Sequence, residues 1–194
     1  MGIDTLRENM LLVHAASADR LLDLGCGSCP DRHLWKACHA HRVVGVDVAP
    51  VDVHDDPNVS LVVANVITDT LRSDDDELFD AVTCMNLLQY VFDTETNVRK
   101  LLENVRHALR YHGAFMGIVP DKAAIEADDT VVPGRKFTFG SARFGRAYTR
   151  DGETQYIVDM DVLKQLATEH GFLFRESFVA DGMRTFVFLK HVFR

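Results

Sequence analysis

Residues 21–31 read LLDLGCGSCPD, an apolar run from Leu21 to Leu24 that passes directly into a turn containing two glycines. Gly25 and Gly27 let the backbone turn tightly and let a ligand approach more closely than a Cβ would permit. Dinucleotide folds carry G-x-G-x-x-G at such a turn, and here the third glycine is replaced by Pro30, which suits the first turn of a helix. This turn therefore disfavours nicotinamide and flavin dinucleotides.

The next apolar run ends in a carboxylate, Asp47, 24 residues after Asp23. A carboxylate at the end of a second strand can accept hydrogen bonds from both hydroxyls of a ribose. Together with the glycine turn, this predicts a nucleoside-containing ligand that lacks a diphosphate.

Outward from this turn, short apolar runs alternate with helical patterns, which predicts buried parallel strands joined by helices. The five predicted strands are Leu21–Leu24, Arg42–Val48, Leu61–Val66, Phe79–Cys84 and Ala114–Val119. Two more, Phe172–Phe178 and Thr185–Val192, flank Asp181-Gly182, a pair that suits an antiparallel hairpin. The pattern predicts an α/β, Rossmann-like, doubly wound and mostly parallel seven-stranded sheet with an antiparallel C-terminal hairpin.

Two helices are expected from apolar residues at helical spacing. The first carries Val98, Leu101, Leu102, Val105, Ala108 and Leu109 at helical spacing. Asp93 or Thr94 is its predicted N-cap, and Gly113 its predicted stop. The second carries Val162, Leu163, Leu166, Ala167 and His170 on one face and is closed by Gly171.

The composition fits one globular domain spanning residues 1–194, with 47% hydrophobic residues and a net charge of −8. No apolar run approaches the roughly 18 residues of a membrane helix, and the first residues lack a signal-peptide pattern. We therefore expect an intracellular protein, in cytoplasm or nucleus, with no membrane partner and with its four cysteines reduced.

The acidic balance argues against broad adhesion to nucleic acid through phosphate neutralisation. One segment differs: Val131 to Arg150 contains five cationic residues and no acidic one, namely Arg135, Lys136, Arg143, Arg146 and Arg150. An RNA partner would be met at this segment. Asp74 to Glu77 is an acidic run that we interpret as a solvated loop.

Cys26 and Cys29 form a C-x-x-C pair, with His33, Cys38, His39 and His41 downstream. A structural zinc site needs its second ligand pair on a short loop, whereas Cys38 and His39 are expected on a helix that packs against the sheet. We therefore predict no metal.

The segment Asp23-Leu24-Gly25-Cys26-Gly27, followed by Asp47, resembles the class I S-adenosylmethionine-dependent methyltransferases. Further motifs are similar to the mRNA cap guanine-N7 methyltransferases, and the likeness extends from about Leu21 to about Phe178. These motifs are Phe79-Asp80, Gly113-Ala-Phe-Met-Gly-Ile-Val-Pro120, Phe144-Gly145 with Tyr148, and Tyr156-Ile157-Val158.

The resemblance implies an S-adenosyl-L-methionine cofactor and a capped RNA 5′ end as substrate. The cofactor residues it implies are Asp23, Gly25, Cys26, Gly27, Asp47, Val48, Asn65, Val66, Met85 and Tyr90. The substrate residues it implies are Gln89, Tyr90, Tyr148 and Gln155. No catalytic side chain is expected, because guanine N7 carries a lone pair and no proton, so in-line transfer needs no general base and depends on proximity and orientation.

The chain also departs from that family. Gln89 replaces a histidine, Gln155 replaces the glutamate that reads the guanine edge, Ser28 replaces a lysine and Asn65 an aspartate, and no lysine corresponds near Asn9. An amide at 155 lacks the charge-assisted part of a hydrogen bond to guanine, so Gln155→Glu is expected to strengthen cap use.

Two alternatives stay open on the sequence. One is a methyltransferase of the same fold that acts on a small molecule. The other is a catalytically silent, cofactor-binding subunit of a capping complex, which Gln89 and Gln155 favour. The resemblance also suggests other capping-enzyme subunits as partners, and the absence of the basic N-terminal extension of cellular members suggests a compact viral protein.

Overall fold

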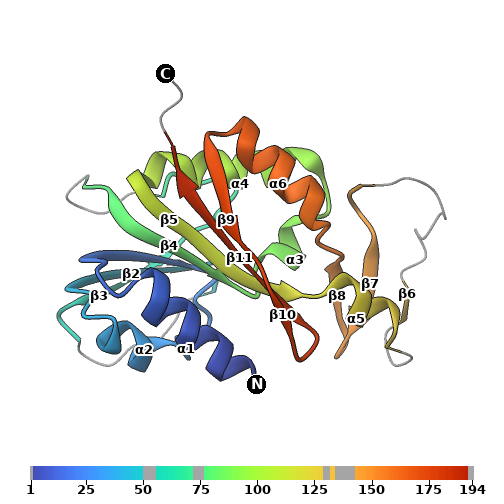
Figure 1. The fold of residues 1–194 in the computed structure, drawn as a ribbon, viewed down its shortest axis with the longest axis horizontal. Coiled ribbons are helices and arrows are strands. Elements are labelled where there is room, and N and C mark those ends of the chain that lie inside the picture. Colours follow the sequence, from blue (N-terminus) through green and yellow to red (C-terminus); the bar gives the residue numbers. More distant parts are fainter. Residues whose placement is uncertain (1, 50–55, 72–76, 129–131, 134–142, 192–194) are drawn as a thin grey trace.

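The computed structural model describes residues 2–49, 56–71, 77–128, 132–133 and 143–191 (Figure 1). The helices are α1 (Ile3–His14), α2 (Arg32–Ala37), α3 (Leu88–Val91), α4 (Glu95–Ala108), α5 (Lys122–Glu126) and α6 (Met160–Glu169). The strands are β1 (Arg20–Leu24), β2 (Arg42–Asp47), β3 (Val59–Val63), β4 (Phe79–Met85), β5 (Leu109–Pro120), β6 (Val132–Pro133), β7 (Ala147–Arg150), β8 (Glu153–Tyr156), β9 (Phe172–Glu176), β10 (Val179–Ala180) and β11 (Met183–Lys190).

The main sheet has the order β10-β11-β5-β4-β1-β2-β3, and β9 also pairs with β11. Strands β3, β2, β1, β4 and β5 are parallel, with β1 in the middle between β2 and β4. This order reverses direction at β1, and ligands in doubly wound sheets bind where the order reverses, at the carboxyl ends of the strands. The predicted fold class is confirmed.

The C-terminal hairpin is antiparallel as predicted, with Asp181 and Gly182 at its turn, both at positive φ. The strand expected over Phe172–Phe178 ends two residues earlier, as β9, and its pairing with β11 shifts register between Val187 and Phe188. A further short strand that was not predicted, β10, follows it and pairs with the start of β11, so the sheet counts eight strands.

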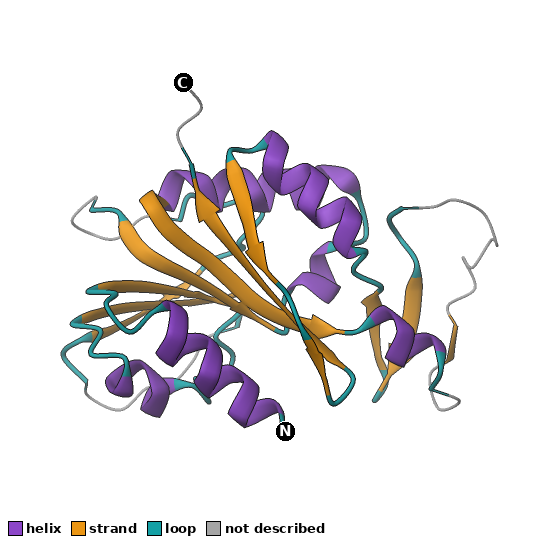
Figure 2. Cartoon of the chain, viewed as in Figure 1, coloured by secondary structure: helices purple, strands orange, loops and turns teal. Residues whose placement is uncertain are grey.

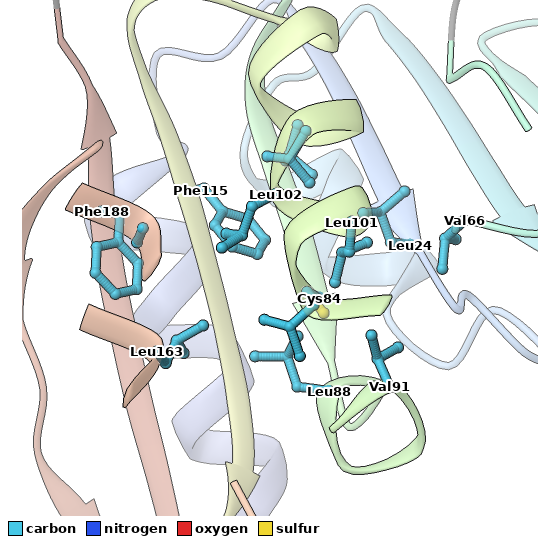
Figure 3. Packing of buried hydrophobic residues seen from close by; sticks show 14 of the residues in the cluster. Leu24, Val66, Cys84, Leu88, Val91, Leu101, Leu102, Phe115, Leu163 and Phe188 are labelled. Atoms are coloured by element: carbon cyan, nitrogen blue, oxygen red, sulfur yellow. The ribbon is translucent and has the colours of Figure 1, made fainter. Parts of the chain in front are cut away.

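Helices cover both faces of the sheet, with α1 and α2 on one face and α4 and α6 on the other (Figures 1 and 2). The core on the α4–α6 side includes Cys84, Leu101, Leu102, Phe115, Leu163 and Phe188 (Figure 3). A second cluster lies under α1 and α2 and contains Leu6, Met10, Trp35 and Met116. Within the described residues, no helix is long and apolar enough to cross a membrane.

Helix α4 begins as predicted, with the Thr94 hydroxyl accepting a hydrogen bond from the Asn97 amide. It ends at Ala108, so the prediction that Gly113 stops the helix is wrong. Gly113 lies inside β5, where the pairing with β4 shifts between Phe79 and Ala81. A Cβ on Gly113 would lie 2.9 Å from the Asp80 carbonyl oxygen. Glycine is therefore required at this position because the backbones of β4 and β5 approach each other closely there.

A second, three-stranded antiparallel sheet has the order β6-β7-β8 and lies beside the carboxyl-end edge of the main sheet (Figure 1). No part of it was predicted from the sequence. It is attached to α3: the Gly145 amide donates to the Phe92 carbonyl oxygen at 3.0 Å. The Phe144 ring stacks on the Phe92 ring with centroids 5.4 Å apart. The small sheet is thereby held against the segment that follows β4.

Candidate cofactor and substrate site

The glycine loop is tied to the end of β2 by its own backbone. The amides of Gly25 and Cys26 both donate to the Val46 carbonyl oxygen, at 2.8 and 3.1 Å. Gly25 and Gly27 have φ of +69° and +51°, a left-handed conformation that side-chain-bearing residues rarely adopt. The two glycines are therefore required by the shape of the turn.

Asp47 is the last residue of β2, and its carboxylate accepts two backbone hydrogen bonds. Oδ2 accepts from the Gly27 amide at 2.9 Å, and Oδ1 from the Ala49 amide at 3.0 Å. Each carboxylate oxygen has two lone pairs, so both can accept one further donor. A Cβ built on Gly27 would meet nothing within 4 Å, so the space above the loop is open on this side. These features fit a ribose held by Asp47 over the loop.

The start of α3 lies directly against the glycine loop. A Cβ on Gly25 would lie 2.9 Å from Leu87 Cδ1, so the loop and the residue preceding α3 are in close contact. The carboxyl ends of β1, β2 and β4 therefore form one continuous surface.

Asp23 lies inside β1 and is 3% exposed. Its Oδ1 accepts a hydrogen bond from the Thr83 hydroxyl at 2.5 Å. Burial raises the pKa of Asp23 to about 7, because the low-dielectric surroundings disfavour the charged carboxylate. Asp23 therefore links β1 to β4 just before the loop and can carry a proton near neutral pH.

This raised pKa predicts a pH-dependent stability. Between the unfolded pKa of 3.8 and the folded value of about 7, the native state binds more protons than the unfolded state, so stability falls as pH rises through this window. The loss is about 4 kcal/mol at most, at 1.36 kcal/mol per pKa unit. Asp23→Asn should flatten that fall in urea unfolding measured from pH 4 to 8. The exposed Asp161→Asn is the control, and an equal slope in Asp23→Asn and wild type would contradict the shift.

Helix α1 brings a cation to the same place. Arg7 Nη1 lies 3.6 Å from Asp31 Oδ1 just after the loop, and the charge of Arg7 also acts to lower the pKa of Asp23. We expected no N-terminal cation near the cofactor. Arg7 was missed, although it follows the buried Leu6 at the margin of the apolar face of α1.

The segment that follows β4 carries two buried amide oxygens with no hydrogen-bond donor among the described residues, Asn86 Oδ1 just after the strand and Gln89 Oε1 in α3. Met85 is buried, and Asn86 follows it at φ +61°. Buried polar atoms without a partner are uncommon and usually meet a ligand or a water molecule. Asn86 was not predicted as a site residue, because its positive φ, which belongs to the turn after β4, is seen only in the structure.

Tyr90, Tyr148 and Gln155 come together although they lie on three different elements. The Tyr148 hydroxyl donates to Gln155 Oε1 at 2.7 Å, and Gln155 Nε2 donates to the Tyr90 hydroxyl oxygen at 3.1 Å. Tyr148 is 1% exposed, whereas Tyr90 is 42% exposed. Three of the four predicted substrate residues therefore lie together, and their contact with a substrate stays a prediction.

Three predicted cofactor residues lie at the ends of β2 and β3. Val48 is exposed, Val66 is buried, and the Val66 carbonyl oxygen accepts from Asn104 of α4 at 2.9 Å. Asn65 is exposed, and its Oδ1 accepts from the Ile67 amide at 2.9 Å. The side-chain oxygen of Asn65 therefore shapes its own turn.

The basic segment is only partly visible, since Arg135 and Lys136 lie outside the described residues, as do residues 74–76 of the acidic run. The remaining acidic residue, Glu77, pairs with Arg20 at 3.0 Å. Three arginines of the basic segment contact α5, the residues after it, or α6. Arg143 donates to Gln165 at 2.6 Å, Arg146 pairs with Glu126 at 2.7 Å, and Arg150 with Asp128 at 3.2 Å.

All four cysteines are free and buried. Burial raises the pKa of the Cys26 and Cys29 thiols, which keeps them protonated and unreactive at neutral pH. In the part of the chain that the structure describes, no three His, Cys, Asp or Glu residues are grouped to hold a metal ion.

Comparison with known proteins gives a family match. Residues 8–146 match the family described as the mRNA (guanine-N(7))-methyltransferase domain. The mRNA cap guanine-N(7) methyltransferase of Cryptococcus neoformans is 24% identical over 192 residues, covering 78% of this chain and 31% of that protein. The Caenorhabditis elegans protein of the same name is 31% identical over 119 residues, covering 53% and 31%. The chain spans about a third of the length of these relatives.

Among solved structures, an S-adenosylmethionine-dependent methyltransferase from Mesorhizobium loti shares the fold. Its TM-score is 0.67 at 16% sequence identity, with 97% of this chain and 98% of that chain covered. At this identity the likeness concerns the arrangement of helices and strands.

Proposed function

The chain belongs to the mRNA (guanine-N(7))-methyltransferase domain family, and from this premise we propose that it transfers a methyl group from S-adenosylmethionine to N7 of the guanine at a capped RNA 5′ end. One observation carries the proposal. The glycine loop contacts Leu87, and three residues later Tyr90 reaches the Tyr148–Gln155 pair. The predicted cofactor and base contacts therefore lie side by side at one edge of the sheet.

S-adenosylmethionine is the methyl donor of this family, so membership in the family confirms the expected cofactor. Its sulfonium supplies an electrophilic methyl group. The chain's own residues fit such a ligand: Asp47 offers carboxylate oxygens to a ribose, and the open backbone at Gly27 leaves room beside it. The unpartnered oxygens of Asn86 and Gln89 can accept hydrogen bonds from a bound amine or ammonium group.

The acceptor side needs orientation and no proton transfer. Guanine N7 attacks with its lone pair, so the residues around it have only to hold the base in line with the methyl group. Correct positioning of two reactants can supply roughly 7–11 kcal/mol. Tyr90 is the exposed aromatic side chain at this place and offers its ring face and hydroxyl to a base.

The proposal includes an intracellular location and other capping-enzyme subunits as partners. The described arginines of the basic segment support its RNA acceptor. Arg146 and Arg150 form partly exposed ion pairs, and such pairs contribute little stability. A phosphate can therefore replace the carboxylate partner at small cost. If Arg143, Arg146 and Arg150 each met one phosphate, the logarithm of capped-RNA affinity should fall against the logarithm of salt with a slope of about −2. A slope near zero in a salt titration would exclude phosphate contacts by these arginines.

Transfer of labelled methyl to capped RNA, compared with GTP and uncapped RNA, tests the proposed function. We expect label in capped RNA only. Label in a small metabolite and in no RNA would favour the small-molecule alternative. Binding of the cofactor without turnover on any acceptor would favour a silent subunit, the reading supported by glutamines at 89 and 155.

A further inference from the structure

Gln155 is buried and hydrogen-bonded at both ends of its amide. Its Oε1 accepts from Tyr148, its Nε2 donates to Tyr90, and the residue is 9% exposed. Gln155 therefore links the two tyrosines, and as a neutral amide it offers no negative charge to a base. A charged acceptor for a guanine edge has to come from another side chain.

Glu153 lies on the same face of β8 as Gln155, because side chains two residues apart on a strand point the same way. Its Oε2 accepts a hydrogen bond from the Tyr90 hydroxyl at 2.6 Å. Glu153 is exposed, and within the described residues its Oε1 has no hydrogen-bond donor or cation. Glu153 thus presents its free Oε1 and the remaining lone pair of Oε2 beside the exposed tyrosine.

No cation of the small sheet is paired with the Glu153 carboxylate among the described residues. Arg150 is the cation opposite Glu153 in the β7–β8 register. Its Nη2 is directed to Asp128 at 3.2 Å. Burial and the neighbouring Glu153 raise the pKa of Tyr90, so the tyrosine stays a neutral donor to the carboxylate.

Guanine presents two adjacent donors on its Watson–Crick edge, N1–H and the 2-amino group, whereas adenine presents an acceptor at N1. We propose that Glu153 is a specificity-determining residue that accepts both guanine donors, while Tyr90 and Gln155 hold its carboxylate in position. This inference rests on the proposed function, since it names how that same site recognises its base. It also supplies at 153 the negative charge that Gln155 lacks.

The test compares RNA capped with guanosine and RNA capped with inosine, which lacks the 2-amino group. For wild type we expect inosine to lower kcat/KM about tenfold, through KM, as for loss of one hydrogen bond to a charged acceptor. Glu153→Gln keeps an oxygen for Tyr90 and loses the charge, so the guanosine-to-inosine ratio should fall to about twofold. Glu103→Gln, on an exposed position of α4, is the matched control and should keep the wild-type ratio.

An unchanged ratio in Glu153→Gln would overturn the proposal. Binding of guanosine and inosine cap analogues to the same variants, measured by calorimetry, gives the ratio independently of turnover. Wild type that binds with the expected ratio and transfers no methyl would contradict the proposed function alone. Wild type that binds neither analogue would contradict both.

Gln155→Glu distinguishes the two positions on β8. A carboxylate at 155 would keep accepting from the Tyr148 hydroxyl and would lose the hydrogen that Nε2 donates to Tyr90, whose own proton is donated to Glu153. Because this loosens the hold on Tyr90 and leaves Glu153 as the exposed acceptor, we now expect no gain in guanosine preference, in contrast to the expectation from sequence. A clear gain would place base recognition at 155 and exclude Glu153 as its acceptor. Thermal melting of each variant confirms that the fold is retained.

Discussion

Asp47→Ala is expected to weaken S-adenosylmethionine binding at least a hundredfold. The variant removes two charge-assisted hydrogen bonds to ribose hydroxyls, each contributing roughly 1.5–3 kcal/mol. It also releases the amides of Gly27 and Ala49, which the carboxylate holds at 2.9 and 3.0 Å, so the loop loses its present shape. Both effects act in the same direction.

Calorimetric titration with the cofactor measures this loss. Asp47→Asn keeps one acceptor oxygen and should lie between wild type and Asp47→Ala. Asp161→Ala, at an exposed position on α6, is the control for removing an acidic residue elsewhere. Equal affinity in Asp47→Ala and wild type would remove the ribose assignment.

Gly117→Ala should have the largest effect on stability, a loss of at least about 3 kcal/mol, at the upper end of overpacking effects. A Cβ on this residue of β5 would lie 2.2 Å from the Cys84 carbonyl oxygen and 2.5 Å from Phe186 Cζ. Cys84 and Phe186 are fully buried in the sheet, so neither can move aside without displacing a strand. The neighbouring strand β4 leads into the site, so cofactor affinity should fall as well.

Urea unfolding measures this loss as a lower midpoint with an unchanged slope. Gly2→Ala is the control, because a Cβ there meets nothing within 4 Å and the residue has φ −69°. Because Gly2 is the N-cap of α1, where alanine is disfavoured, that variant should lose no more than about 1 kcal/mol. A Gly117→Ala protein as stable as wild type would mean that β4 and β5 separate more easily than their packing indicates.

The central sheet and helices α4 and α6 were predictable because their signals are local. Apolar runs end in turns, and the caps at Thr94 and Asp159 precede residues at helical spacing. The prediction that Gly113 ends α4 was wrong for a physical reason. A glycine after a helix usually ends it, whereas Gly113 lies inside β5, at the point where β5 shifts its register against β4.

The small sheet was not predictable, because its strands are two to four residues long and have no apolar alternation. Without it, Tyr148 and Gln155 could be named only through a family resemblance. Glu153 was missed for the same reason, since its relation to Gln155 depends on β8 being a strand. Asn86 and Arg7 depend on backbone geometry and on the packing of α1.

The small sheet also bears on how the proposed acceptor preference can be altered. All of it, with α5, comes from one contiguous segment between the end of β5 at Pro120 and the start of α6 at Met160. The predicted cofactor residues all precede this segment, and the small sheet meets their end of the main sheet along Leu87 to Phe92. Exchange of that single segment, with Leu87 to Phe92 retained, is therefore expected to change the acceptor without rebuilding the predicted cofactor site.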